Sequence, residues 1–191
     1  MTPFDPDAYG SAVAPLLRGD RLNPLDPGRP DAAARPLLER LARDGDLGGP
    51  ILDREAAAAC QAGLWLLHNY LDEAHALAQD LDGAEGSYWH ALMHRREPDF
   101  ANSKYWSRRV GQHPIFEPLR ADAARLAADQ RHSSTDFLKS QSAWDPFAFV
   151  DLCAVALAGR LPCTELCQQI QRREWELLFD YCFRLARGIE R

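Results

Sequence analysis

The spacing of apolar residues is helical along most of the chain. From about residue 36 to Gly188, hydrophobic residues recur every three or four positions, which is the period of one face of an α-helix. No segment of useful length alternates between apolar and polar residues, so no β-strand is expected. We therefore predict an all-α fold of stacked antiparallel helical hairpins, either tetratricopeptide-like or an irregular helical bundle.

Capping residues and helix breakers set the expected boundaries. Asp53, Ser87 and Asp99 are predicted N-caps, and Pro98 is predicted to break the chain between two helices. The resulting helices are 36–45, 54–68, 69–82, 88–97, 100–111, 119–128, 145–159 and a long last helix from Pro162 or Thr164 to Gly188. The polar stretch 131–142 separates the final pair of helices from the rest.

The N-terminal region is rich in proline, with seven of the thirteen prolines in residues 1–36. Because proline lacks an amide donor and fixes φ, this stretch is expected to be mostly irregular, with room for a short helix near 7–17. We predict one all-α domain over 1–191, with a Pro-rich arm over about 1–35. A length of 191 residues fits a single domain.

Two predicted hairpins echo each other, because HNYLDEAHALAQDL (68–81) aligns with EPDFANSKYWSRRV (97–110). In this alignment Leu71 corresponds to Phe100, and Ala74 corresponds to Ser103. Small residues let paired helices approach closely, and in this respect residues 54–114 resemble tetratricopeptide-type repeats, which stack hairpins into a concave binding surface. The turn glycine of those repeats is missing, and the period is shorter than the usual ~34 residues.

The block HRREPDFANSKYWSRRVGQHP (94–114) also resembles one found in an uncharacterised family of bacterial and fungal proteins. This resemblance implies no activity. Residues 87–114 nevertheless hold three of the six histidines and two of the five tryptophans. Such a density of imidazole, aromatic and basic groups marks this block as the place to look for a site.

Charge and cysteine content narrow the possible partners. The net charge of −6, from 22 Lys and Arg against 28 Asp and Glu, argues against nucleic-acid and anionic-membrane binding. No secretory signal and no run of ~18 apolar residues is present, so we expect no membrane association and a cytoplasmic location.

The five cysteines include no CxxC pair, which fits reduced thiols. Cys163 and Cys167 have a spacing that two zinc ligands can use, but core thiols are the preferred interpretation because no second pair stands nearby.

His90 and His94 are the candidate metal ligands, since residues four apart project from one side of a helix beside Glu97. Imidazole and carboxylate suit zinc or iron. The glutamate of an HExxH motif is absent, and His68, His113 or a distant acid would have to complete the set. His75 is expected to be half-buried on an apolar stripe. Two possibilities therefore follow from the sequence: the protein has no cofactor, or it binds one zinc or iron ion. The first is the preferred interpretation.

The basic residues of the block admit two interpretations. The guanidinium group of arginine donates paired hydrogen bonds to carboxylates and phosphates, so the block can form a site for an anion or a peptide terminus. Internal pairing is the favoured alternative, with Arg96 or Arg109 bound to an acid such as Glu97, Asp99, Glu174 or Asp180.

We therefore expect a non-enzymatic helical binding or scaffold module that recognises a peptide, a protein partner or a small anionic ligand. Its ligand-binding residues would be His90, His94, Arg95, Tyr105 and Arg108. The alternative is a metal-dependent enzyme, a hydrolase by preference, with His90 and His94 as ligands and Glu97 or Glu73 as ligand or base. No nucleophile or nucleotide-binding motif is present to decide between them.

Overall fold

The computed structural model describes residues 4–19, 21–45 and 47–189, and helices are the only regular secondary structure within these ranges. This confirms the predicted all-α fold. None of the described helices combines the length and the apolar composition that crossing a lipid bilayer requires. The helices are η1 (Pro6–Tyr9), α1 (Gly10–Leu17), α2 (Arg35–Asp44), α3 (Arg54–Leu67), α4 (Leu71–Ala78), α5 (Ala84–Arg96), α6 (Phe100–Val110), α7 (Phe116–Leu126), η2 (Ser133–Thr135), α8 (Asp136–Ser140), α9 (Pro146–Leu157) and α10 (Thr164–Arg187).

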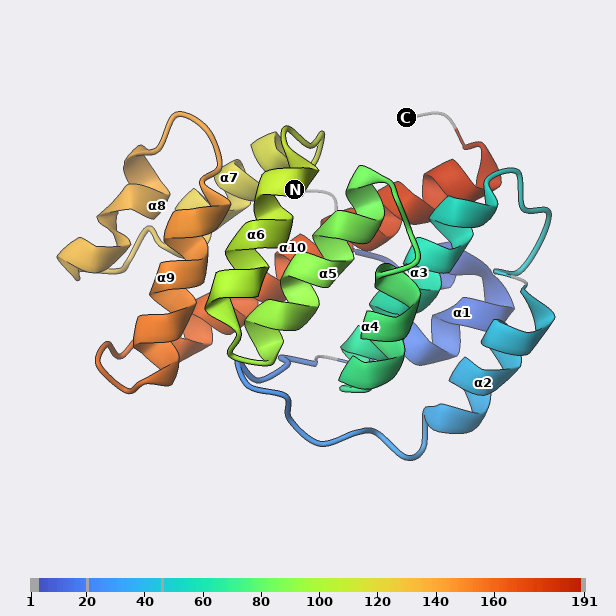
Figure 1. The fold of residues 1–191 in the computed structure, drawn as a ribbon. Helices are drawn as coiled ribbons and strands as arrows, with labels where there is room; N and C mark the ends of the chain where they lie inside the picture. The colour runs from blue at the N-terminus through green and yellow to red at the C-terminus, as the bar shows by residue number, and fades with distance from the viewer. Residues whose placement is uncertain (1–3, 20, 46, 190–191) are drawn as a thin grey trace.

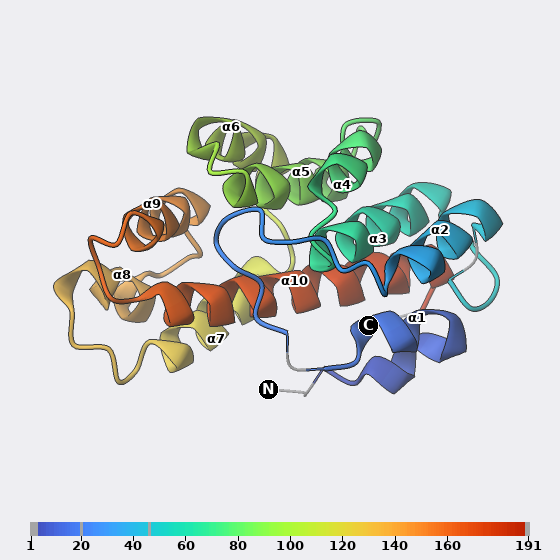
Figure 2. The same ribbon diagram turned by 90° about the horizontal axis from the view of Figure 1, so that it is seen from below.

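The long helix α10 is the axis around which the others are arranged (Figure 1). Helices α3, α7 and α9 contact α10, α4 and α5 contact α3, and α6 lies between α5 and α9. Seen from below, α4, α5 and α6 lie on one side of α10, with α1 and α7 on the other (Figure 2). The inner face of α10 carries Ile170, Leu178 and Phe179, all fully buried. Leu185, which follows the same three- and four-residue spacing, is 39% exposed and lies outside this face.

Several helix boundaries differ from the sequence prediction: α4 is shorter than 69–82, α7 begins at Phe116 rather than 119, and α5 begins earlier. Helix α5 begins at Ala84 rather than after Ser87, which is buried inside the helix. Gly86 permits this earlier start, because a Cβ there would lie 2.3 Å from the Cβ of Leu81. The polar stretch 131–142 is not only a connection, since it contains η2 and α8.

The α5–α6 hairpin is closed by small residues, as the aligned segments predicted. The Ser103 hydroxyl donates a hydrogen bond of 2.8 Å to the carbonyl of Ala91, and both residues are buried. A larger side chain at either position would force the helices apart. The likeness to tetratricopeptide repeats itself stays a prediction.

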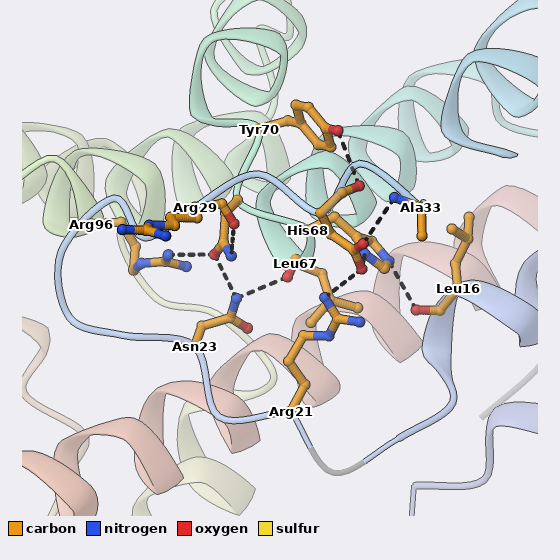
Figure 3. A network of polar contacts seen from close by, with 11 residues as sticks. Leu16, Arg21, Asn23, Arg29, Ala33, Leu67, His68, Tyr70 and Arg96 are labelled. Atoms are coloured by element: carbon orange, nitrogen blue, oxygen red, sulfur yellow. Dashed lines mark hydrogen bonds and ion pairs between the residues drawn. The ribbon is translucent and has the colours of Figure 1, made fainter. Parts of the chain in front are cut away.

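The N-terminal arm lies against the helices and is held by polar contacts. Its expected short helix is present as η1 and α1, and an irregular segment follows from Arg21 to Ala34. Figure 3 shows how this segment is attached to the ends of α3 and α5. Asn23 donates to the carbonyl of Leu67 at 2.8 Å, and Asp31 lies 3.2 Å from His68.

Candidate metal centre

Three histidines from neighbouring helices meet between α4, α5 and α6. His75 lies on α4, and His90 and His94 lie one turn apart on α5, which packs against α4. One potential ligand atom on each ring lies within 4.8 Å of those on the other two. In the described part of the chain, no other three His, Cys, Asp or Glu residues form such a group. We call these three residues the histidine cluster.

The rings of the cluster are in direct contact. The His90 ring stacks on Trp106 of α6 at 3.9 Å between centroids, and on His94 at 4.8 Å. The His75 ring stands edge-on to both, at 4.6 Å from His90 and 5.4 Å from His94. His90 and His94 are buried, with exposed fractions of 3% and 8%, whereas His75 is half-buried. Trp106 thus forms a wall that shields the imidazoles from water on one side.

Two imidazole nitrogens of the cluster lack hydrogen bonds. Within the described chain, Nδ1 of His90 and Nδ1 of His94 are buried and have no hydrogen-bond partner. The His94 Nδ1 atom lies 3.2 Å from Oε2 of Glu97, a close contact whose direction does not make a hydrogen bond. Leaving a buried polar nitrogen unpaired costs about 1–3 kcal/mol. A ligand that uses these side chains would offset that cost.

Both α5 histidines are held in the neutral form. Burial lowers the pKa of His90 to about 4, and repulsion from His94 and His75 acts in the same direction. Burial is also the main cause of the lowered pKa of His94, against the opposing effect of the Glu97 charge. Neutral imidazole is the form that binds a metal ion, so these side chains need not lose a proton to do so at pH 7.

The spacing of the cluster fits a first-row transition metal after small side-chain rotations. A tetrahedral zinc ion holds imidazole nitrogens at about 2.0–2.1 Å, which places two such nitrogens about 3.3 Å apart. The ligand atoms here are at most 4.8 Å apart. Because the His90 and His94 rings are nearly parallel, at 14°, they have to turn for their lone pairs to converge. The Glu97 carboxylate lies 3.2 Å from Nδ1 of His94, so a small rotation would let it accept a hydrogen bond and orient the ring, as carboxylates do for ligating histidines.

The other residues proposed from the sequence to complete a metal site lie elsewhere. His68 contacts Asp31 and the carbonyl of Leu16. His113 lies 3.9 Å from Glu85, against the ring of Tyr88. The expected set of His90, His94 and Glu97 does lie together, but its third imidazole is His75.

Glu73, the other carboxylate considered as a ligand or base, is 3.1 Å from Arg35. Its ion pair with an arginine of α2 gives it a structural contact away from the α5 histidines. Of the two carboxylates considered from the sequence, Glu97 is the one in contact with the histidine cluster.

Arg95 is not presented to solvent. It is 4% exposed and its Nη2 atom lies 2.6 Å from Oε2 of Glu174, while the Tyr88 hydroxyl donates to Oε1 of the same carboxylate at 2.9 Å. The sequence favoured an internal ion pair of this kind, but it predicted Arg96 or Arg109, not Arg95, as the arginine in the pair. The Nε of Arg95 and the Oε1 of Gln171 have no partner in the described chain, and both residues line a cavity of about 20 Å³. That volume is sufficient for one water molecule.

Arg96 ties the N-terminal arm to α5. It donates to the carbonyls of Asp26 and Pro27 at 2.9 and 3.1 Å. It also donates to Oδ1 of Asn69 at 2.7 Å (Figure 3). Burial lowers the pKa of Arg96 to about 10, so it remains charged at pH 7 while bound to neutral oxygens.

Tyr105 and Arg108 lie on the exposed side of α6, away from the buried groups. Tyr105 is 49% exposed, and the guanidinium of Arg108 is 5.3 Å from the ring of Phe147. No carboxylate in the described chain forms an ion pair with Arg108. The five expected ligand-binding residues therefore fall in three places: the histidine cluster, the buried Arg95 pair and this outer face.

Sequence reasoning missed His75 and Trp106 as parts of the centre. His75 is half-buried, as expected, and its ring turns toward α5. A signal for this exists in the predicted stacking of hairpins, which brings helices of neighbouring hairpins into contact. Comparison with known protein families, with curated proteins and with solved structures finds no match to this chain.

Proposed function

We propose that this protein binds one divalent transition-metal ion, zinc by preference, at the histidine cluster. The observation that carries the proposal is the convergence of three imidazoles, two of them with buried and unpartnered nitrogens. An uncommitted polar nitrogen in a protein interior calls for an explanation, and metal ligation is one. Neutral imidazole suits zinc, and three histidines are a known zinc ligand set.

A three-histidine site also suits catalysis, because it leaves a fourth coordination position for a water molecule or substrate. Zinc held in this way lowers the pKa of a bound water to about 7, which supplies the nucleophile for hydrolysis. A pocket of about 270 Å³ adjoins Glu97, between residues 27–30 of the arm and residues 69–73. Glu97 thus contacts His94 on one side and lines a pocket on the other, where it can position a substrate or accept a proton. Metal-dependent hydrolysis is the reaction class we favour.

The metal content of untagged protein, purified without chelator and measured by elemental analysis before and after incubation with zinc, tests the proposal. We expect one zinc equivalent in the wild type and its loss in a His90→Ala/His94→Ala variant. His132→Ala is the matched control, because His132 is exposed in the segment before η2. Glu97→Gln should retain zinc with about 10–100-fold weaker affinity, since it removes only the orienting carboxylate.

The result that would overturn the proposal is the same zinc content in the wild type and the double variant. A screen of ester, amide and phosphoester substrates with the zinc-loaded protein then separates catalysis from binding alone. Activity that disappears in Glu97→Gln while zinc is still bound supports the hydrolase.

A second candidate function rests on the outer face of α6. Tyr105 is exposed beside Arg108, which has no ion-pair partner in the described residues. An aromatic ring next to an uncommitted guanidinium is a suitable contact for a peptide carboxylate or another anion. Partner capture with the wild type and with a Tyr105→Ala/Arg108→Ala variant tests it, since loss of the partner is expected only in the variant. A cytoplasmic location stays a prediction for either function.

A further inference from the structure

Three of the five cysteines lie together where α9 and α10 meet. Cys153 is on α9, Cys163 directly precedes α10, and Cys167 is one turn into it. The Sγ atoms of Cys163 and Cys167 are 3.9 Å apart. Interaction with Cys153 is the largest cause of the raised pKa of Cys167, which indicates that Cys153 lies nearby. The three sulfurs are not all close enough to one another to form a ligand group, so Cys163 and Cys167 are the pair in contact. We call these three residues the thiol cluster.

The sulfur separation matches that of two thiolates on a shared metal ion. A disulfide bond requires about 2.05 Å between sulfurs. A first-row metal ion holds thiolate sulfur at about 2.3 Å, which gives a separation of about 3.8 Å in a tetrahedral shell and about 4.0 Å in a trigonal one. The observed 3.9 Å therefore needs almost no adjustment for a metal ion, whereas a disulfide would require the two sulfurs to move together by nearly half that distance.

The thiol cluster has an opening at Cys163. A surface pocket of about 240 Å³ is lined by Cys163 together with Gln130, Pro162, Glu165, Leu166 and Gln169. Cys153 and Cys167 lie behind it and are fully buried. An ion can thus reach Cys163 first and pass to Cys167.

The surroundings of the thiol cluster favour a metal ion that needs only two or three sulfur ligands. A structural zinc site needs four protein ligands, and in the described residues no third His, Cys or carboxylate forms a ligand group with Cys163 and Cys167. Cu(I) prefers thiolates and accepts two or three of them. A copper–thiolate unit of this kind is negatively charged. The buried guanidinium of Arg95 is close enough to Cys153 for their charges to interact, and so can stabilise it.

We propose that the thiol cluster binds one Cu(I) ion, with Cys163 and Cys167 as its two thiolate ligands. Binding involves no change in oxidation state, and each thiol that becomes a ligand releases one proton. A cysteine thiol ordinarily keeps its proton at pH 7. The affinity for Cu(I) should therefore rise about tenfold per pH unit for each proton released.

An anaerobic titration of the reduced protein with Cu(I), in competition with a coloured Cu(I) chelator, tests the proposal. We expect one tight equivalent, at least 100-fold weaker binding in Cys163→Ser and Cys167→Ala, and a smaller loss in Cys153→Ala. Serine is a favourable N-cap residue at position 163, so Cys163→Ser should keep α10 intact, which circular dichroism checks. The matched control is Cys60→Ala, a buried thiol on α3 outside the cluster.

X-ray absorption at the copper edge distinguishes the thiol cluster from the histidine cluster. Copper bound by thiolates shows sulfur at about 2.3 Å, whereas copper bound by imidazoles shows nitrogen at about 2.0 Å. A His90→Ala/His94→Ala variant should bind Cu(I) as the wild type does. Unchanged affinity in the folded Cys163→Ser variant, or a copper shell of nitrogen alone, would overturn the proposal.

Discussion

His94 and Arg95 are neighbours on α5, yet they differ in hydrogen bonding: Arg95 is bonded to a carboxylate, whereas Nδ1 of His94 has no hydrogen bond. Arg95 points into the core, where it meets Glu174, and both oxygens of that carboxylate are bonded. His94 points toward α4, where its Nδ1 atom is buried without a hydrogen bond. A helix turns about 100° per residue, so adjacent side chains reach different surroundings. The Arg95–Glu174 pair therefore stabilises the fold. The His94 imidazole, which lacks a hydrogen bond at Nδ1, is the group that can bind a ligand.

The largest expected effect comes from breaking the buried pair. Glu174→Ala leaves the Arg95 guanidinium in the core without its carboxylate, and should lower the free energy of unfolding by about 3–5 kcal/mol. Urea denaturation followed by circular dichroism measures this. Glu165→Ala, an exposed residue of the same helix, is the control and should change stability by less than about 0.5 kcal/mol. If both variants have the same stability, the Arg95 pair does not brace the fold.

Arg96→Ala should have the next largest effect, because it removes a buried side chain and its three hydrogen bonds to the arm and to Asn69. We expect a loss of about 2–3 kcal/mol and faster proteolysis within residues 21–34. Limited proteolysis with mapping of the cleavage sites measures the release of the arm. Arg109→Ala, which removes an exposed arginine stacked on Trp106, is the control and should leave the arm protected.

Acid should destabilise the metal-free protein through the histidine cluster. The unfolded chain protonates a histidine near pH 6.5, whereas burial holds the pKa of folded His90 at about 4. Stability should therefore fall as the pH drops from about 6.5 to about 4, by about 3 kcal/mol, with little further loss from this group below pH 4.

Denaturation at a series of pH values measures this dependence, and His90→Gln separates it from other groups. The pKa values of His94 and His68 are also lowered by burial, so the variant should keep part of the acid dependence. An acid profile in His90→Gln that equals that of the wild type would contradict the assignment.

The smallest expected effect on stability belongs to the outer face of α6. Tyr105→Ala/Arg108→Ala should change the free energy of unfolding by less than about 1 kcal/mol, because Tyr105 is half-exposed and Arg108 contacts one ring. Thermal denaturation measures it. A loss as large as that of Arg96→Ala would show that this face is structural and would remove the case for a partner there.

The sequence allowed the fold class and the α5 part of the site to be predicted, because both depend on local spacing. The four-residue interval of His90 and His94 places them together on any α-helix. The start of α5 could not be predicted, since it depends on how closely Gly86 approaches Leu81. The role of His75 and the identity of the Glu174 partner depend on how α4 and α10 pack against α5, which no local pattern contains.

X-ray absorption at the zinc edge of the loaded protein tests the central claim most directly. The histidine cluster predicts nitrogen or oxygen ligands at about 2.0 Å, the scattering pattern of three imidazoles, and no sulfur at 2.3 Å. In His75→Ala the imidazole signal should fall to two rings, with zinc affinity reduced by more than about 100-fold. Sulfur in the first shell of the wild type, or an unchanged spectrum and affinity in His75→Ala, would contradict the account.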